Sequence, residues 1–159
     1  MGMYSTNNRL AGAQQNLTTT YKTLIGLNAA TATLRRGRLW EIEVGTDAAP
    51  NATDCPVTWD IARMTAAGTG TAATPLPLNP ADAASDTVAT VNYTAEPTVT
   101  AASTLLALAL NQRASQRWVA FGPDQALVWP ATNLAGLVVR ALSPTYASVA
   151  LATAMHEDL

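Results

Sequence analysis

The sequence predicts an all-β protein folded as a single antiparallel β-sandwich domain, and three observations support this prediction. Short segments in which apolar and polar residues alternate recur along the chain, and this period of two is typical of half-buried strands. Segments rich in Gly, Pro, Asn and Asp separate them at the regular spacing expected of a two-sheet sandwich. The length of 159 residues suits one domain with one core.

The clearest strand is expected within Arg35–Asp47, which has the sequence RRGRLWEIEVGTD. Apolar and polar residues alternate from Arg38 onward, and several of the apolar ones are β-branched or aromatic. Gly45 and the Asp- and Asn-containing segment after it are expected to end the strand. One face is predicted to carry Trp40, Ile42 and Val44, and the other face Leu39, Glu41 and Glu43.

The N-terminal segment Met1–Asn16 is polar and is interpreted as an arm with little core of its own. The remaining residues, 17–159, form the predicted sandwich domain. Leu17–Leu27 is expected to be a strand of this domain, and Val57–Arg63 is a second clear one. Because a polar loop joins the strands at 35–47 and 57–63, these two are expected to be antiparallel neighbours.

Thr65–Thr98 is a long connection between predicted strands. The Gly and Pro residues of its first half argue against regular structure there, whereas Val91 and Tyr93 are compatible with a strand near its end. Its apolar residues Leu76, Leu78 and Tyr93 are too many for a solvated linker. The segment is therefore expected to be an ordered loop that packs on this chain or on a neighbour.

The segment Ser103–Gln112 allows two interpretations. Its sequence, STLLALALNQ, is rich in helix formers, and Leu106 and Leu110 would share a helical face. The leucines at 106, 108 and 110 also alternate with alanines, and the flanking segments have β patterns, so a strand is favoured. The further predicted strands are Arg117–Phe121, Ala126–Trp129, Leu134–Leu142 and Thr145–Met155, the last with Ala147, Val149 and Leu151 on one face.

The composition is 48% hydrophobic and only 13% charged, with many Ala and Thr residues. Such a neutral surface is suited to lying against other protein. The net charge is −2 and Lys22 is the only lysine, so the cation cluster that nucleic acid or an anionic membrane requires is missing. No run is long enough to span a bilayer and the first residues do not resemble a cleaved signal, so a soluble protein is expected.

Few residues are suited to catalysis, and the chain is not expected to be an enzyme. His156 is the only histidine and is interpreted as a solvated tail residue. Cys55 is the only cysteine, which excludes an intrachain disulfide, and it is interpreted as a small buried hydrophobic residue. Asp82 and Asp86 have the chemistry to share a cation, but solvation of a loop is favoured for both. No catalytic, cofactor-binding or metal-ligating residue is predicted.

Five segments carry a resemblance to a known family: RRGRLWEIEVG, VTWDIARMTAAGTGTAATPLPLNPADAAS, VNYTAEPT, LALNQRASQRWVAF and LVWPATNLAGLVVRAL. Together they span most of the chain from about Arg35 to Thr153, and they resemble the capsid decoration, or cement, proteins of tailed bacteriophages. The resemblance rests on the overall pattern, and no motif in it carries chemistry. It implies a jelly-roll-like β-sandwich without enzymatic activity. It also implies a protein made in the host cytoplasm that sits on the outer capsid surface of the virion, binds the major capsid protein and braces capsomers, commonly as a homo-trimer.

Capsid contacts are expected from elements that the sandwich core leaves over. A sandwich buries its own apolar faces, so binding is assigned to the N-terminal arm and the 65–98 loop, and the arginines near position 36 are expected to add a few ion pairs. Joining copies into a ring would raise the effective concentration of each contact. The predicted interface residues are Met3, Tyr4, Arg9, Leu10, Arg35, Arg36, Leu76, Leu78 and Tyr93.

Two other classes of function are considered. A receptor- or glycan-binding module of a phage tail or fibre uses the same sandwich folds, and exposed aromatic residues such as Trp129 or Tyr146 around a concave site would favour it. Trp40 and Trp59 share their faces with aliphatic residues and are expected in the core instead. A hydrolase would need an acid pair or a metal cluster, which the sequence does not suggest.

Overall fold

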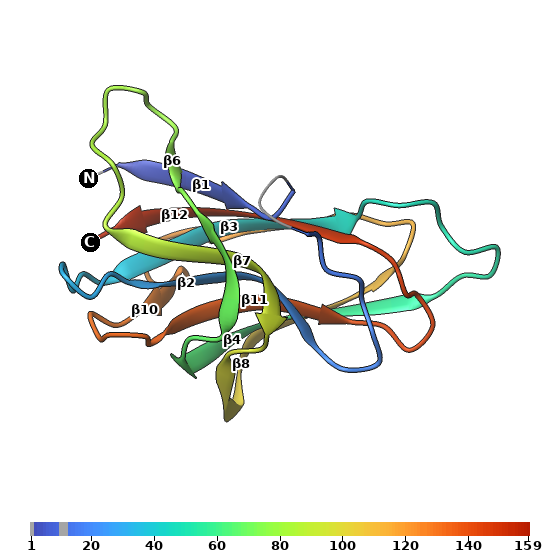
Figure 1. Ribbon diagram of the computed structural model, residues 1–159. Coiled ribbons are helices and arrows are strands. Elements are labelled where there is room, and N and C mark those ends of the chain that lie inside the picture. The colour runs from blue at the N-terminus through green and yellow to red at the C-terminus, as the bar shows by residue number, and fades with distance from the viewer. Residues whose placement is uncertain (1, 10–12) are drawn as a thin grey trace.

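The structure is a computed structural model and describes residues 2–9 and 13–159. Within these residues the chain forms twelve strands and no helix, arranged as two six-stranded sheets in which every strand pair is antiparallel (Figure 1). The first sheet has the order β10 (Leu127–Trp129), β3 (Gly37–Thr46), β12 (Ala150–Asp158), β1 (Met3–Asn7) and β6 (Leu76–Pro77), and β9 (Gln116–Val119) also pairs with β3. The second sheet has the order β5 (Thr69–Ala73), β7 (Thr87–Ala95), β2 (Lys22–Ala29), β11 (Gly136–Leu142), β4 (Pro56–Ala66) and β8 (Thr98–Asn111).

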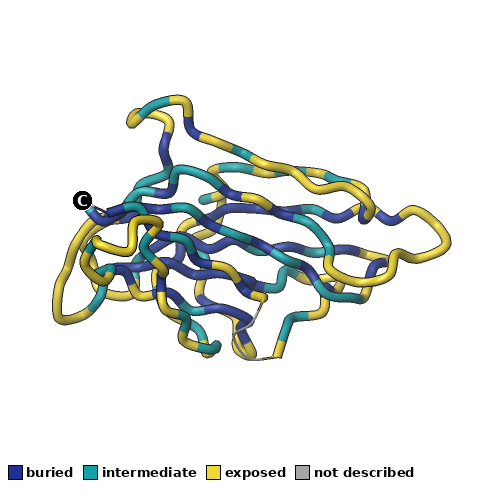
Figure 2. The backbone as a smooth tube through the Cα atoms, turned by 90° about the horizontal axis from the view of Figure 1, so that it is seen from above, coloured by how far each residue is buried: buried dark blue, intermediate teal, exposed yellow. Residues whose placement is uncertain are grey.

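Successive strands lie in different sheets except for β4 and β5, β7 and β8, and β9 and β10, so the chain crosses repeatedly from one sheet to the other. The protein is therefore a jelly-roll-like antiparallel β-sandwich, which confirms the predicted fold class. The core between the sheets contains Trp59, Trp129 and Tyr146 together with aliphatic side chains. In Figure 2 the buried segments run along the strands, and the loops at both ends of the sandwich are exposed.

A β-bulge in β3 corrects the predicted face pattern of this strand. Met155 and His156 of β12 lie opposite Glu41 and Leu39, so Trp40 has no partner of its own in β12. The extra residue reverses the alternation of side chains. Leu39 is consequently buried together with the apolar residues beyond the bulge, and Trp40 is only half-buried. The prediction that Trp40 lies in the core and that Leu39 faces away from it is wrong, whereas Trp59 lies in the core as expected.

Gly37, the first residue of β3, lies against the ring of Trp129 from the neighbouring β10. A Cβ atom on Gly37 would be 1.9 Å from Cζ2 of this tryptophan. Trp129 is completely buried, so its ring has little room to move away. The first glycine of the RRGRLWEIEVG segment is therefore required by close packing.

Strands β3 and β4 lie in different sheets, so the expectation that they are antiparallel neighbours is wrong. β3 pairs with β12, β9 and β10, and β4 pairs with β11 and β8. The loop of residues 47–55 crosses from one sheet to the other, and it is long enough for the roughly 10 Å between packed sheets. A polar loop of this length is compatible with either arrangement, which is why its sequence did not distinguish them.

The N-terminal segment is an integral part of the first sheet. β1 lies between β12 and β6 (Figure 1). Tyr4 and Thr6 are buried, and the amide of the buried Asn8 hydrogen-bonds to the main chain of β12. The interpretation of Met1–Asn16 as an arm with little core of its own is therefore wrong for this strand. The polar composition hid the strand because only alternate side chains of β1 enter the core.

The predicted 65–98 loop contains three strands. β5 and β6 fall in its first half, so the expectation of irregular structure there is wrong, and β7 confirms the strand expected around Val91 and Tyr93. β5 and β6 are edge strands of the two sheets, and Pro77 lies in β6. An edge strand tolerates proline because one side of it has no pairing partner.

The remaining predicted strands are present with shifted ends, but the face predicted for the last of them is wrong, because Ala147 and Val149 precede β12 and Ala147 is exposed. Ser103–Gln112 is extended and belongs to β8, which confirms the strand interpretation. β12 begins and ends later than the predicted Thr145–Met155. Its core face carries the buried alanines at positions 150, 152 and 154, and Leu151 is half-buried.

Candidate functional site

The predicted interface residues divide into exposed and buried ones. Leu76 in β6 and Leu78 just after it are 60% and 54% exposed. Tyr4 and Tyr93 are only 4% and 1% exposed, so both belong to the core and are corrected as contact residues. Among the others, Arg9, Arg35 and Arg36 are exposed, Met3 is half-buried, and Leu10 lies outside the described residues.

Tyr93 is buried because β7 carries it across β2. Its hydroxyl lies over Gly26, where a Cβ atom would come within 2.1 Å of the tyrosine Oη. Burial raises the pKa of Tyr93 to about 12. The prediction treats this aromatic residue of a Pro-rich segment as an interface contact, but the segment forms an inner strand at this point.

Leu76 and Leu78 stand on the β6 edge of the first sheet. β6 pairs with β1, where Leu76 lies opposite Ser5, and the Leu78 N–H donates to the Met3 carbonyl at 2.8 Å. These bonds hold the backbone in place while both side chains remain exposed. The two leucines therefore form a preorganised apolar contact at a sheet edge, and we refer to them as the β6 edge pair.

Two carboxylates near this edge, those of Asp86 and Asp158, form hydrogen bonds or ion pairs with other residues of the same chain. Asp158 accepts hydrogen bonds from the hydroxyls of Ser85 and Thr87 at 3.0 and 2.5 Å and from the Asp86 N–H at 2.7 Å. The Asp86 carboxylate in turn lies 3.0 Å from Nε of Arg35. Across residues 2–9 and 13–159, no group of three or more His, Cys, Asp or Glu side chains is placed to hold a metal ion.

His156 is completely buried, so its interpretation as a solvated tail residue is wrong. Its Nε2 lies 3.1 Å from Oγ1 of Thr6, its ring stacks on Tyr4, and Trp129 meets it edge-on, with ring centroids 5.9 Å apart in both pairs. Burial lowers the pKa of His156 from 6.5 to about 4, and the nearby Asp158 opposes this change in part. The residue is internal because β12 runs through the middle of the first sheet.

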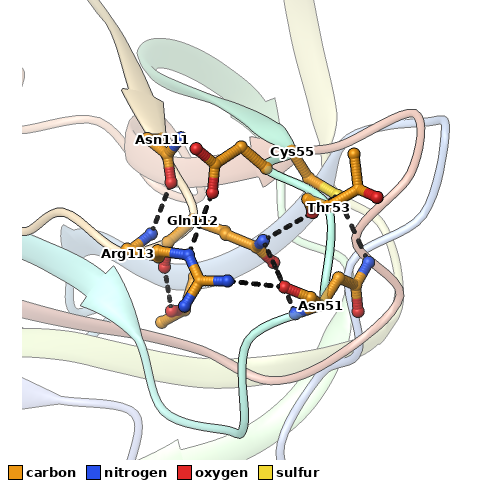
Figure 3. Close-up of polar contacts among 8 residues, drawn as sticks. Asn51, Thr53, Cys55, Asn111, Gln112 and Arg113 are labelled. Carbon is orange, nitrogen blue, oxygen red and sulfur yellow. Dashed lines mark hydrogen bonds and ion pairs between the residues drawn. The ribbon is translucent and has the colours of Figure 1, made fainter.

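Gln112 fixes the loop that crosses between the sheets (Figure 3). The side chain is 1% exposed, and its Oε1 accepts the Asn51 N–H at 3.0 Å. Its Nε2 donates to the carbonyls of Asn51 and Thr53 at 3.2 and 2.9 Å, and its main-chain N–H donates to the Cys55 carbonyl at 2.9 Å. The amide is thus fully used in holding residues 51–55 against the end of β8.

The same cluster continues to the surface through Arg113. Its Nε lies 2.9 Å from Oδ1 of Asp54, and its Nη2 donates to the Asn51 carbonyl at 2.8 Å. Cys55 is buried, and its thiol hydrogen-bonds to Asn51 and Thr53, in agreement with its interpretation as a small buried residue. These hydrogen bonds tie the loop to the end of β8, and Asn51 also donates to the Thr145 carbonyl at 3.0 Å, so the cluster is a structural clamp.

One long side of the sandwich is incompletely covered. Leu106, Leu108 and Leu110 of β8, Trp118 of β9 and Leu127 of β10 pack on the core but are only partly buried. β8 is the last strand of the second sheet, and β9 and β10 are the short outer partners of β3 in the first. We call the surface formed by these five residues the open side.

An exposed aromatic residue lies near the open side. Phe121 is 94% exposed just after β9, and it lines a shallow hollow with Arg117, Trp118 and Gln125. Trp129 and Tyr146, in contrast, are completely or almost completely buried. The two aromatic residues named as possible glycan contacts are therefore core residues.

No known protein family, curated protein or solved structure matches this chain. In the part of the chain that the structure describes, no helix is long and apolar enough to cross a membrane. The fold and the surface of the molecule are therefore the basis for a functional proposal.

Proposed function

We propose that this chain is a structural virion protein that binds the outside of a phage capsid and stabilises the shell by bridging capsomers. Its partner in this role is the major capsid protein, and its copies associate on the shell as a homo-trimer. The observation that carries the proposal is the β6 edge pair, two exposed leucines held rigidly at the edge of a sandwich. The resemblance of the sequence to capsid decoration proteins supports the same role.

The β6 edge pair is suited to a modest contact that repetition strengthens. Burying a leucine side chain stabilises a complex by up to about 1.5–3 kcal/mol, and both side chains are already partly covered. Their backbone is ordered by β1, so binding does not require the ordering of a flexible loop. Copies joined on one shell raise the effective concentration of each contact, which converts modest affinity into stable occupancy.

The test is binding to capsids that lack the protein, measured as occupancy against protein concentration. A double variant, Leu76→Ser and Leu78→Ser, should raise the concentration for half-occupancy at least about tenfold, because each tenfold step corresponds to only about 1.4 kcal/mol. The control is Val88→Ser, which removes an apolar side chain that is 40% exposed on β7 of the other sheet. Unchanged occupancy of the double variant would remove the β6 edge pair from the account.

A salt series distinguishes an apolar contact from an ionic one. With low charge on the chain, wild-type occupancy should change little from low to high salt. A steep loss of binding with salt would contradict this mechanism and assign the contact to Arg35 and Arg36. Removal of the first residues is unsuitable as a test, since it would delete β1 from the sheet.

A second candidate is a receptor- or glycan-binding module, favoured by the hollow beside Phe121. An exposed aromatic ring flanked by Arg117 and Gln125 offers a stacking face and hydrogen-bonding groups to a sugar. In this case Phe121→Ser should abolish binding to a host glycan and leave capsid occupancy unchanged. A capsid-binding defect in this variant, without glycan binding by the wild type, would rule the second candidate out.

A further inference from the structure

The outer edge of β8 is free over a long, uncharged segment. Among residues 2–9 and 13–159, β8 pairs only with β4, and between Glu96 and Arg113 the sequence has no charged residue. Natural proteins usually protect such edges with lysine, proline or bulges. The first half of β8 is protected in this way, since its pairing with β4 is interrupted by register shifts, but the part from Leu106 to Asn111 pairs regularly and lacks such a device.

The hydrogen-bonding direction of this regular part follows from its pairing. The main-chain N–H of Gln112 donates to the Cys55 carbonyl, so these two residues form a hydrogen-bonded pair. The next pair, Asn111 with Pro56, is a non-bonded pair, and the proline has no N–H group. In an antiparallel ladder, bonded and non-bonded pairs alternate. Leu106, Leu108 and Leu110 therefore direct their main-chain groups toward β4, and the N–H and C=O groups of the alanines at 107 and 109 point to the free edge.

The core-facing side chains of the same segment are only partly covered by other residues. Leu106, Leu108 and Leu110 pack on the core but remain partly exposed on the open side of the sandwich. A strand added to the β8 edge would hydrogen-bond to the free main-chain groups and cover these leucines at once. The required occupant is thus an extended segment with apolar side chains at alternate positions.

The segment itself meets this requirement, because its sequence is a palindrome. Leu-Ala-Leu-Ala-Leu reads the same in both directions about Leu108. We propose that the β8 edge binds the β8 edge of a second copy of this chain, antiparallel and with Leu108 on the two-fold axis. In this register Ala107 forms a hydrogen-bonded pair with Ala109 of the other copy, and Leu106 lies beside the other copy's Leu110.

Charge and symmetry are consistent with this contact. No like charges meet between the paired segments, and the antiparallel direction brings the Glu96 end of one strand toward the Arg113 end of the other. The two copies extend the second sheet of each sandwich into one continuous sheet, and the leucines of both form a row on its core face. A two-fold contact of this kind is closed, so it joins two chains and does not grow into a fibre. It is a contact between free chains in solution, separate from the β6 edge pair and from the association of three copies on the shell, and it does not depend on the proposed capsid role.

The test measures molecular mass by sedimentation equilibrium from about 10 μM to about 1 mM, a range that covers weak self-association. The wild-type mass should rise from the 16.6 kDa of one chain to twice this value. The edge variant Ala107→Lys and Ala109→Lys places charges on the exposed face of the strand and should stay monomeric. The control variant Ala131→Lys and Thr132→Lys adds the same charges to the exposed loop between β10 and β11 and should behave as the wild type.

A third variant, Ala107→Pro, removes one free-edge N–H without removing a bond between β8 and β4. It should weaken dimerisation at least about tenfold while circular dichroism remains that of the wild type. Amide hydrogen exchange gives an independent readout: the amides of Ala107 and Ala109 should become protected as concentration rises, whereas that of Leu108 is protected throughout. A wild type that stays monomeric up to 1 mM, or a dimer or trimer that both edge variants leave intact, would overturn the proposal.

Discussion

Acidification should destabilise the protein through the buried His156. Its pKa is lowered from 6.5 to about 4 by burial, so the fold holds the neutral ring. Between these two pH values the unfolded chain binds a proton that the folded chain does not bind. The contribution of His156 to stability is therefore fully present above pH 6.5 and is lost progressively as the pH falls from 6.5 toward 4.

The size of this loss follows from the same two values. Each pH unit in this window changes the free energy of unfolding by about 1.4 kcal/mol, which amounts to about 2.4 kcal/mol between pH 7 and pH 4.5. This is a large part of the roughly 5–15 kcal/mol that stabilises a typical domain. Carboxylates also lose stabilising bonds in acid; the pKa of Glu41, for example, is lowered mainly by its hydrogen bond from Arg117. A comparison with a variant is needed to isolate the histidine.

The assay is urea unfolding of the wild type and of His156→Gln at pH 7 and pH 4.5, followed by tryptophan fluorescence. The variant should be less stable at pH 7, because the packing on Tyr4 and Trp129 is lost. Its free energy of unfolding should nevertheless fall by about 2 kcal/mol less than that of the wild type on going to pH 4.5. An equal fall in both proteins would refute the assignment of acid sensitivity to His156.

Two further predictions concern stability at pH 7. Arg140→Ala should lower the free energy of unfolding by about 3 kcal/mol or more, because it removes the charge partner of the buried Asp60 carboxylate, which lies 2.7 Å from the guanidinium in the wild type. Arg113→Ala, which breaks a solvent-exposed pair with Asp54, should lower it by about 1 kcal/mol or less. Equal costs in the two urea titrations would contradict this ranking. Gly37→Ala should cost about 1–3 kcal/mol through overpacking against Trp129, and a melting temperature equal to that of the wild type would show that the ring can yield.

The period-two pattern was sufficient for the fold class because most strands of this sandwich have one core face and one outer face. It placed Trp59 and the leucines of β8 correctly, since each lies in a locally regular strand. It failed at Trp40, where a single bulged residue changes the face of everything beyond it, and a bulge has no signature in the alternation itself. The local pattern therefore predicts where strands lie better than it predicts which side chains face the core on either side of a bulge.

Residues distant in sequence account for the other differences. His156 was interpreted as solvated because it lies near the end of the chain, but its environment is set by β1 and by Trp129. Tyr4 is buried for the same reason, since its contacts come from β12. Leu76 and Leu78 are predicted contact residues from composition alone; both side chains are exposed, and their role in binding stays a prediction. The free edge of β8 had one signal in the sequence, the uncharged palindrome around Leu108.

The most direct test of the proposed function is an electron cryo-microscopy map of capsids incubated with the protein. The account predicts additional density on the outer surface of the shell, at contacts between capsomers, into which the sandwich fits with the β6 edge pair facing the capsid. Density at the tail or fibres alone, or capsids without added density at saturating protein, would contradict it.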